Sequence, residues 1–131
     1  MFEKTKAFSG FAVGDIAAAK QFYGETLGIR VTEDAGMLTL HLGGERPVLV
    51  YPKEDHTPAD YTILNFPVDD IAAAVEQLSA RGVRFERYEG TPMATDEQGI
   101  FRGGGPLIAW FRDPAGNVLS VIEMASGPDG R

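Results

Sequence analysis

The chain contains no cysteine among its 131 residues. Disulfides, thiolate metal ligands and thiol nucleophiles are therefore excluded, and a cytoplasmic location is favoured over a secreted one. No apolar run approaches the roughly 20 residues that a membrane-spanning helix needs. The first residues also lack the apolar core of a signal peptide. We expect a cytoplasmic protein with no membrane partner.

Basic side chains are also scarce. Twelve lysines and arginines are outnumbered by nineteen aspartates and glutamates, which gives a net charge of −7. Nucleic-acid binding is disfavoured because it depends on basic groups that neutralise phosphates. An acidic surface favours solubility and attracts cationic ligands more readily than anionic ones. We expect no nucleic-acid partner.

One segment of the sequence occurs twice. Residues 11–19 recur as residues 66–74, and the two copies differ only at their second and fourth positions. The recurrence includes the end of a strand as well as an alanine-rich helix, so it indicates a duplication.

Each copy begins with an alternating segment, residues 6–13 and 61–68, which predicts a strand. Asp15 and Asp70 follow, where a side-chain oxygen caps a helix, and a glycine ends each predicted helix. Further strands are expected at residues 29–33, 37–42, 47–51 and 83–88.

Residues 107–123 consist of two apolar runs joined by residues 113–117, Asp-Pro-Ala-Gly-Asn. Asp, Pro and Gly stand at the positions that a type I turn favours, so the pattern predicts a β-hairpin. Its register pairs Trp110 with Ser120 and places Arg112 on the same face. This mixed face suits a ligand site, whereas the more apolar face is expected to carry the helices.

The element order predicts an α+β protein of two tandem β-α-β-β-β modules, which form a curved mixed sheet around an open cleft. We expect a single domain over residues 1–131, with module one at about 6–52, a linker at about 53–60 and module two at about 61–124. Residues 89–105 are expected to be a long irregular loop, of a length typical of functional loops.

This organisation resembles the vicinal oxygen chelate superfamily of lactoylglutathione lyases, extradiol dioxygenases and bleomycin- or fosfomycin-resistance proteins. The first set of matching motifs is Val13-x-Asp15, Phe22-Tyr23 and Leu27-Gly28. The second is Phe111-Arg-Asp-Pro-Ala-Gly-Asn117 before an apolar strand. The resemblance covers roughly residues 6–124.

The resemblance also implies where a metal would be held. Metal-using members place His, Gln or Glu at four cleft-facing points, on the first and last strands of each module. Carried over by spacing, the points fall on Phe8, on Val50 or Tyr51, on Ile63 and on Ser120. These residue types are rare or impossible ligands for zinc, nickel or iron. We expect no bound metal and no other cofactor.

The candidate ligand-binding residues share an expected position on the cleft side of the strands. They are Phe8, Thr39, His41, Tyr51, Asn65, Trp110, Arg112 and Ser120. Trp110 is the only tryptophan, and its ring can stack on a planar or cationic ligand. The equal alternative is that Trp110 fills a core between the modules or a dimer contact.

The chain has only two histidines. We interpret His41 as a hydrogen-bonded wall residue, with a role as general base as the alternative, since histidine titrates near neutral pH. His56 is expected to be solvated in the linker. Arg102 is expected to be solvated in its loop, with a lid over the cleft as the alternative.

Three functions are compatible with these residues. The first is a metal-free protein that binds a small organic molecule in its cleft. The second is a metal-independent isomerase, lyase or hydrolase that uses a cleft residue such as His41. The third is a metal-dependent glyoxalase or dioxygenase with displaced ligands. A homodimer is expected, because a groove between two half-sheets leaves apolar surface that one small chain covers poorly.

Overall fold

The computed structural model describes residues 1–88, 90–92 and 95–124. The chain divides into two compact units, Met1–Pro58 and Ala59–Arg131, which we call module one and module two. Neither helix in the described residues has the length and apolar character that crossing a membrane requires. The sequence prediction that the two units make one domain stays a prediction.

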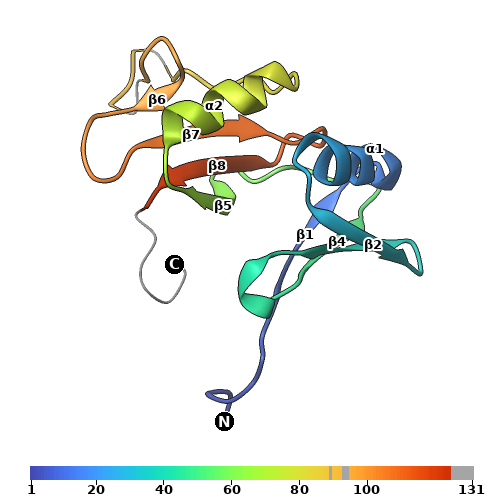
Figure 1. The fold of residues 1–131 in the computed structure, drawn as a ribbon. Coiled ribbons are helices and arrows are strands. Elements are labelled where there is room, and N and C mark those ends of the chain that lie inside the picture. The colour runs from blue at the N-terminus through green and yellow to red at the C-terminus, as the bar shows by residue number, and fades with distance from the viewer. Residues whose placement is uncertain (89, 93–94, 125–131) are drawn as a thin grey trace. The chain divides into compact units, whose positions relative to one another are not determined.

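Module one consists of a four-stranded mixed sheet and one helix (Figure 1). Its elements are β1 (Ser9–Val13), α1 (Ile16–Gln21), a π-helical turn (Phe22–Thr26), β2 (Arg30–Asp34), β3 (Met37–His41), a 3₁₀ turn (Gly43–Glu45) and β4 (Val48–Pro52). The strand order is β1-β4-β3-β2, with β1 parallel to β4 and the other neighbours antiparallel. Leu38, Leu40 and Val50 are fully buried in the core beneath α1.

The first helix begins as predicted but ends differently. Asp15 caps it, since Oδ1 accepts a hydrogen bond from the backbone N–H of Ala18 at 3.1 Å. The α-helix stops at Gln21, and the π-helical turn that follows carries the fully buried Tyr23. Gly28 then reverses the chain with a φ of +70°, a conformation that glycine adopts without steric cost.

Module two has the same topology. Its elements are β5 (Thr62–Val68), α2 (Ile71–Ala80), β6 (Ile100–Phe101), β7 (Ile108–Arg112) and β8 (Val118–Glu123). The strand order is β5-β8-β7-β6, and α2 contacts β7 and β8 (Figure 1). Asp70 caps α2 through the N–H of Ala73, and the carboxylate of Glu123 accepts a second bond from the N–H of Ile71, both at 3.1 Å. The predicted α+β class with two tandem modules is confirmed.

The hairpin of β7 and β8 has the predicted register. Trp110 pairs with Ser120, and the intervening turn is built around Asp113. This side chain is 4% exposed, and its Oδ1 accepts hydrogen bonds from the backbone N–H groups of Ala115 and Asn117. The turn therefore satisfies a buried carboxylate with its own backbone, which holds the two strands in one register.

The strand predicted at residues 83–88 does not form. In the described part of the chain, its one β-bridge joins Phe85 to β7. The segment then leaves the sheet at Tyr88, whose φ of +41° is incompatible with a strand. The strand that pairs with β7 instead is β6. It lies within residues 89–105, the segment that the sequence predicted to be irregular.

Candidate functional site

Three of the predicted site residues form a row across the sheet of module two. Asn65 on β5 is paired with Ser120 on β8, and Ser120 with Trp110 on β7. Ser120 is fully buried, and its hydroxyl donates a hydrogen bond to Oδ1 of Asn65 at 2.5 Å. Glu123, which reaches the start of α2, lies on the other face of β8, so the row faces away from the helix.

The indole of Trp110 is packed within module two and is only 7% exposed. Its Nε1–H donates a hydrogen bond to the hydroxyl of Thr62 at 3.1 Å. The ring of Tyr88 meets it nearly edge-to-face at a centroid distance of 5.4 Å, and that of Phe101 is tilted at 5.8 Å. Trp110 thus serves as core for module two, while the rest of its surface is available to a pocket.

A pocket of about 450 Å³ opens beside Trp110. Its lining residues all belong to module two and are Asp60, Tyr61, Thr62, Tyr88, Thr91, Trp110 and Val118. The floor is buried, since Val118 is 3% exposed, whereas Tyr61 on the rim is 68% exposed. The lining contains three aromatic rings, two hydroxyl-bearing threonines and one carboxylate. An apolar surface with a few polar groups is the usual form of a small-molecule site.

Tyr88 is a pocket residue that sequence reasoning missed. Burial raises the pKa of its phenol, the nearby Glu86 carboxylate raises it further, and Arg112 partly opposes them. The side chain is therefore a neutral hydroxyl at physiological pH. Alternation along the predicted strand places Tyr88 and Phe85 on opposite faces of the sheet. It does not indicate that Tyr88 contacts Trp110.

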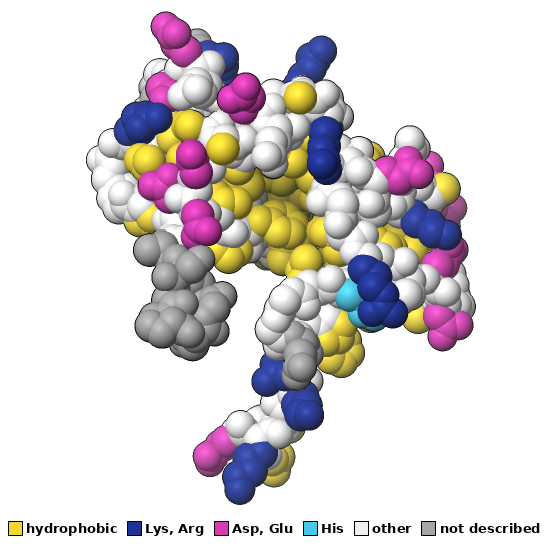
Figure 2. All heavy atoms as spheres, in the orientation of Figure 1, with side chains coloured by type: hydrophobic (Ala, Val, Ile, Leu, Met, Phe, Trp, Pro, Cys, Tyr) yellow, Lys and Arg dark blue, Asp and Glu magenta, His cyan; other side chains and the backbone are white. Residues whose placement is uncertain are grey.

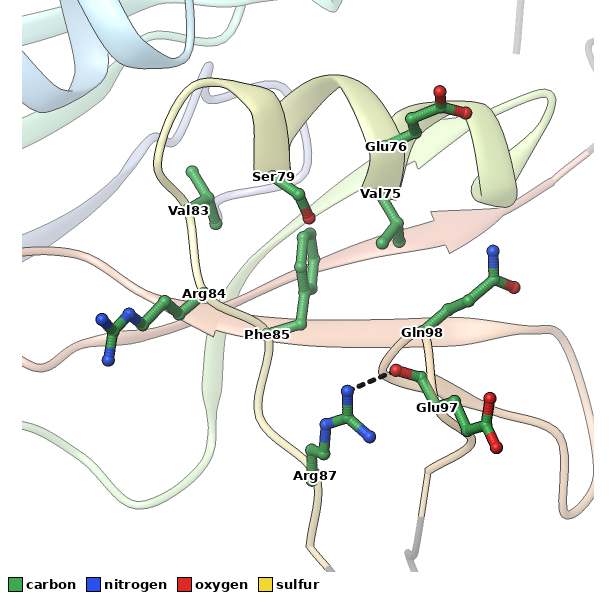
Figure 3. A pocket seen from close by; sticks show the side chains of 9 residues that line it. All are labelled: Val75, Glu76, Ser79, Val83, Arg84, Phe85, Arg87, Glu97 and Gln98. Atoms are coloured by element: carbon green, nitrogen blue, oxygen red, sulfur yellow. Dashed lines mark hydrogen bonds between the residues drawn. The ribbon is translucent and has the colours of Figure 1, made fainter.

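Hydrogen bonds of the preceding residue, Arg87, hold the backbone next to Tyr88 in position. Figure 3 shows the guanidinium of Arg87 directed at the backbone carbonyl of Glu97, to which its Nη2 donates. Thr95 binds the carbonyl of Arg87 through its N–H at 3.1 Å and its hydroxyl at 2.8 Å. Thr95 also donates to the carbonyl of Glu86 at 3.3 Å, so the two residues before Tyr88 are tied to Thr95 and Glu97.

A second cavity, of about 520 Å³, lies between α2 and this tied segment (Figure 3). The ring of Phe85 points from its floor toward Val75 and Ser79 of α2. Its charged lining residues are of both signs, and Arg84 is directed away from the space. The mixed charges of this cavity favour neither a cationic nor an anionic ligand, so the pocket beside Trp110 is the better candidate site.

The two arginines considered for the site are both occupied by carboxylates. Arg112 forms an ion pair with Glu86 and donates to the carbonyl of Gly116 at 3.0 Å. Its hydrogen bond with Glu86 raises the pKa of the guanidinium. Arg102 pairs with Asp96 at 2.7 Å within its own loop, and its side chain is 50% exposed, as expected for a solvated loop arginine.

The remaining predicted residues belong to module one. Thr39, His41 and Tyr51 alternate with the buried side chains of β3 and β4, so they lie on the face away from α1. Nε2 of His41 lies 2.8 Å from the hydroxyl oxygen of Thr32, within hydrogen-bonding distance. Phe8 precedes β1 and is 61% exposed.

The linker histidine differs from its prediction. His56 is half-buried rather than solvated, and its Nε2 atom has no hydrogen-bond partner among the described residues. The chain around it turns back on itself, with the N–H of His56 bonded to the carbonyl of Lys53 at 3.1 Å.

The residues at the four positions implied for metal ligands do not suit a metal ion. Phe8 and Ile63 offer no donor atom, and Ile63 also lies at a β-bulge of β5. The hydroxyl of Ser120 is buried against Asn65. Within the described ranges, no cluster of three or more His, Asp or Glu side chains could hold a metal ion.

The register of module one locates the remaining point. Val13 and Val68 match in the repeat and pair with Pro52 and Glu123. Leu49 and Ser120, each three residues earlier on the last strand of its module, are therefore equivalent. Val50, one of the two predicted positions, is fully buried on the helix side. Tyr51 lies two residues beyond Leu49 on the same face. Leucine is not a metal ligand, so the disagreement with the metal-using pattern extends to all four points.

The fold is shared with many solved structures. A glyoxalase family protein from Enterococcus faecalis is 24% identical, with 94% of this chain and 100% of that one covered and a TM-score of 0.67. The fosfomycin resistance protein FosX from Mesorhizobium loti is 15% identical, with 95% of each chain covered and a TM-score of 0.64. TnmS3, an antibiotic binding protein from a Streptomyces species, is 23% identical, with 91% and 96% covered and a TM-score of 0.62.

Comparison with curated protein sequences gives no significant match. At the identities above, the structural comparisons establish the fold and leave the ligand open. A family model, however, matches residues 7–121, nearly the whole of both modules. The chain therefore belongs to the Glyoxalase/Bleomycin resistance protein/Dioxygenase superfamily, as its motifs implied.

Proposed function

We propose that this protein binds a small organic molecule in the pocket beside Trp110. The observation that carries the proposal is the pocket itself, in which an indole, two tyrosines and a carboxylate surround one space of about 450 Å³. This volume lies within the roughly 300–1,000 Å³ of typical ligand sites. The structural neighbour TnmS3 is an antibiotic binding protein, which supports a binding role for this fold.

A compound screen tests this proposal. Compounds that raise the melting temperature are expected to change tryptophan fluorescence as well, because the only tryptophan lines the pocket. Trp110→Phe is expected to keep the fold and weaken binding. Tyr61→Ala removes an exposed lining ring at little cost in stability. Phe2→Ala, which removes an exposed aromatic ring of module one, is the matched control. Stabilisation that is unchanged in both pocket variants would place the site elsewhere.

A second candidate function is metal-independent catalysis by His41. Its Nε2 and the hydroxyl oxygen of Thr32 are 2.8 Å apart, the distance over which an imidazole accepts a proton from a hydroxyl. An isomerase, lyase or hydrolase reaction would require turnover of a bound compound. Mass spectrometry of that compound after incubation detects turnover, and His41→Ala is expected to abolish it. An unchanged compound favours binding alone.

Metal-dependent glyoxalase or dioxygenase chemistry is the third candidate, and no observed residue favours it. The proposal of a metal-free protein rests on Phe8, Leu49, Ile63 and Ser120 at the four ligand points. Elemental analysis is expected to find no stoichiometric zinc, nickel, manganese or iron, and chelator should leave the melting temperature unchanged. About one tightly held transition metal per chain would overturn this.

We further propose a cytoplasmic homodimer. The absence of cysteine supports the location, and exposed apolar side chains support association. Phe8 and Tyr51 are 61% and 40% exposed, and Figure 2 shows hydrophobic side chains gathered over β5 and β8. Light scattering at micromolar concentration is expected to give the mass of two chains, and the mass of one chain would contradict the proposal.

A further inference from the structure

We propose that the pocket beside Trp110 recognises an organic ammonium group, held between aromatic rings and a carboxylate. This inference rests on the proposed binding function and specifies the chemistry of the ligand. It follows from three properties of the lining: the arrangement of its rings, the sign of its charges and the access that its rim allows.

The rings form two adjoining walls of the pocket. Tyr88 and Trp110 meet at an interplanar angle of 69°, with their centroids 5.4 Å apart, and Tyr61 contributes a third ring to the lining. Aromatic faces attract cations because each ring carries negative charge density above and below its plane. The hydrogen bond from Trp110 to Thr62 occupies the indole N–H and fixes the ring. The walls are therefore positioned before a ligand arrives.

The charges around the pocket favour a cation. Among the described residues that line the pocket, Asp60 is the one charged side chain, and none is a lysine or arginine. Glu86 and Arg112 are the charged groups that act on Tyr88, and they neutralise each other in an ion pair. The net charge of −7 acts in the same direction at longer range. An anionic ligand would meet only repulsion from Asp60.

The shape of the pocket suits the end of a molecule rather than all of it. Val118 and Trp110 close the floor, whereas Asp60, Tyr61 and Thr91 are exposed at the rim. A methylated or alkylated ammonium head, which has a large apolar surface and a diffuse charge, can bury its methyl groups against the rings. The remainder of the ligand can extend past the rim into solvent.

The test compares choline with its neutral isostere 3,3-dimethylbutan-1-ol, in which carbon replaces the charged nitrogen. Titrations are followed by tryptophan fluorescence and by calorimetry. Choline is expected to bind about tenfold or more tightly than the isostere, the ratio that a partly desolvated cation–π contact gives. Asp60→Asn and Tyr61→Ala are each expected to weaken choline binding several-fold, and both positions are exposed, so the fold is preserved. Phe2→Ala, which removes an exposed aromatic ring of module one, serves as the unchanged control.

The outcomes separate this inference from the proposed function. Equal affinity for choline and the isostere, with both lost in Tyr61→Ala, would overturn the ammonium proposal and leave the pocket as a binding site. Choline binding that is unaffected by Asp60→Asn and Tyr61→Ala would also overturn it. No binding of choline or of tetramethylammonium would do the same, while the compound screen would still decide whether the pocket binds other molecules.

Discussion

The two modules share one scaffold but differ on the sheet face away from the helix. Both have a parallel pair of strands at the start of the sheet and an aspartate cap on the helix. The backbone bonds that extend β1 and β5 also match, since Lys53 donates to Val13 and Met124 to Val68, both at 2.9 Å. Duplication has therefore preserved the register as well as the element order.

Equivalent positions carry different side chains across that face. The pairing registers match Gly10 with Asn65, Leu49 with Ser120, and Thr39 with Trp110. In module one, Thr39 and Leu49 are half-buried, whereas Ser120 and Trp110 of module two are buried. The same backbone thus leaves these two central positions partly open in module one and buries them beside a pocket in module two.

The difference arises from the connection after the helix. Module one passes from its π-helical turn to β2 at Arg30, whereas module two places residues 81–99 between α2 and β6. This longer connection supplies Tyr88 and Glu86, which lie against Trp110 and Arg112. Segments outside the repeated scaffold therefore shape the candidate site, as is common when loops carry function on a rigid frame.

The largest loss of stability is expected when a buried side chain on the helix-covered face of either sheet is truncated. Phe111 and its module-one equivalent Leu40 are both fully buried. Phe111→Ala is expected to lower the free energy of unfolding by about 3–5 kcal/mol and Leu40→Ala by about 2–5 kcal/mol, because each leaves a cavity. Urea denaturation measures both losses. A loss under about 1 kcal/mol at either position would show that the modules are not equally packed.

On the sheet face away from the helix, equivalent substitutions are expected to change stability by different amounts in the two modules. Trp110→Ala removes a ring that packs on Tyr88 and Phe101, so about 3–5 kcal/mol of stability should be lost. Thr39→Ala, at the equivalent position, should cost within about 0.5 kcal/mol. Urea denaturation of the two variants side by side measures this contrast. Similar losses would contradict the view that only module two covers this face.

The helix caps offer a smaller and more symmetrical test. Asp15→Ala and Asp70→Ala each remove one hydrogen bond of 3.1 Å to a backbone N–H, a loss of about 1 kcal/mol. Asp70→Ala should be the milder change, because Glu123 also binds the start of α2, whereas the equivalent residue of module one is Pro52. Thermal unfolding of both variants measures which one loses more stability. A larger loss in Asp70→Ala would contradict this role of Glu123.

The smallest effect concerns pH and the longer connection of module two. Burial raises the pKa of Asp96, but hydrogen bonds from Arg102 and from the backbone of Ile100 and Gln98 outweigh it and hold the pKa below its usual value. A lowered pKa in the folded state adds stability above about pH 4, which is lost as pH falls through that lower value. Asp96→Asn should therefore be less stable than the wild type at pH 7, with the difference shrinking toward pH 3. Urea midpoints at the two pH values measure it, and a constant difference would contradict it.

Features specified by neighbouring residues could be predicted from the sequence. The caps of Asp15 and Asp70 and the turn at Asp113 depend on side chains that bond the backbone within four residues. The register of the hairpin follows from that turn, and the repeat identified the two modules. In each case, the atoms that determine the structure lie in one short stretch of chain.

Features that depend on distant contacts were decided by the tertiary structure alone. The ion pair of Arg112 joins residues 26 positions apart, and the bond from Trp110 to Thr62 spans 48. Tyr88 reached the pocket because its positive φ ended a strand that alternation predicted, and β6 pairs with β7 beyond the bridge of Phe85. A hydrophobic pattern shows which face of a segment is buried but not which partner buries it, so only the folded chain could place these side chains around Trp110.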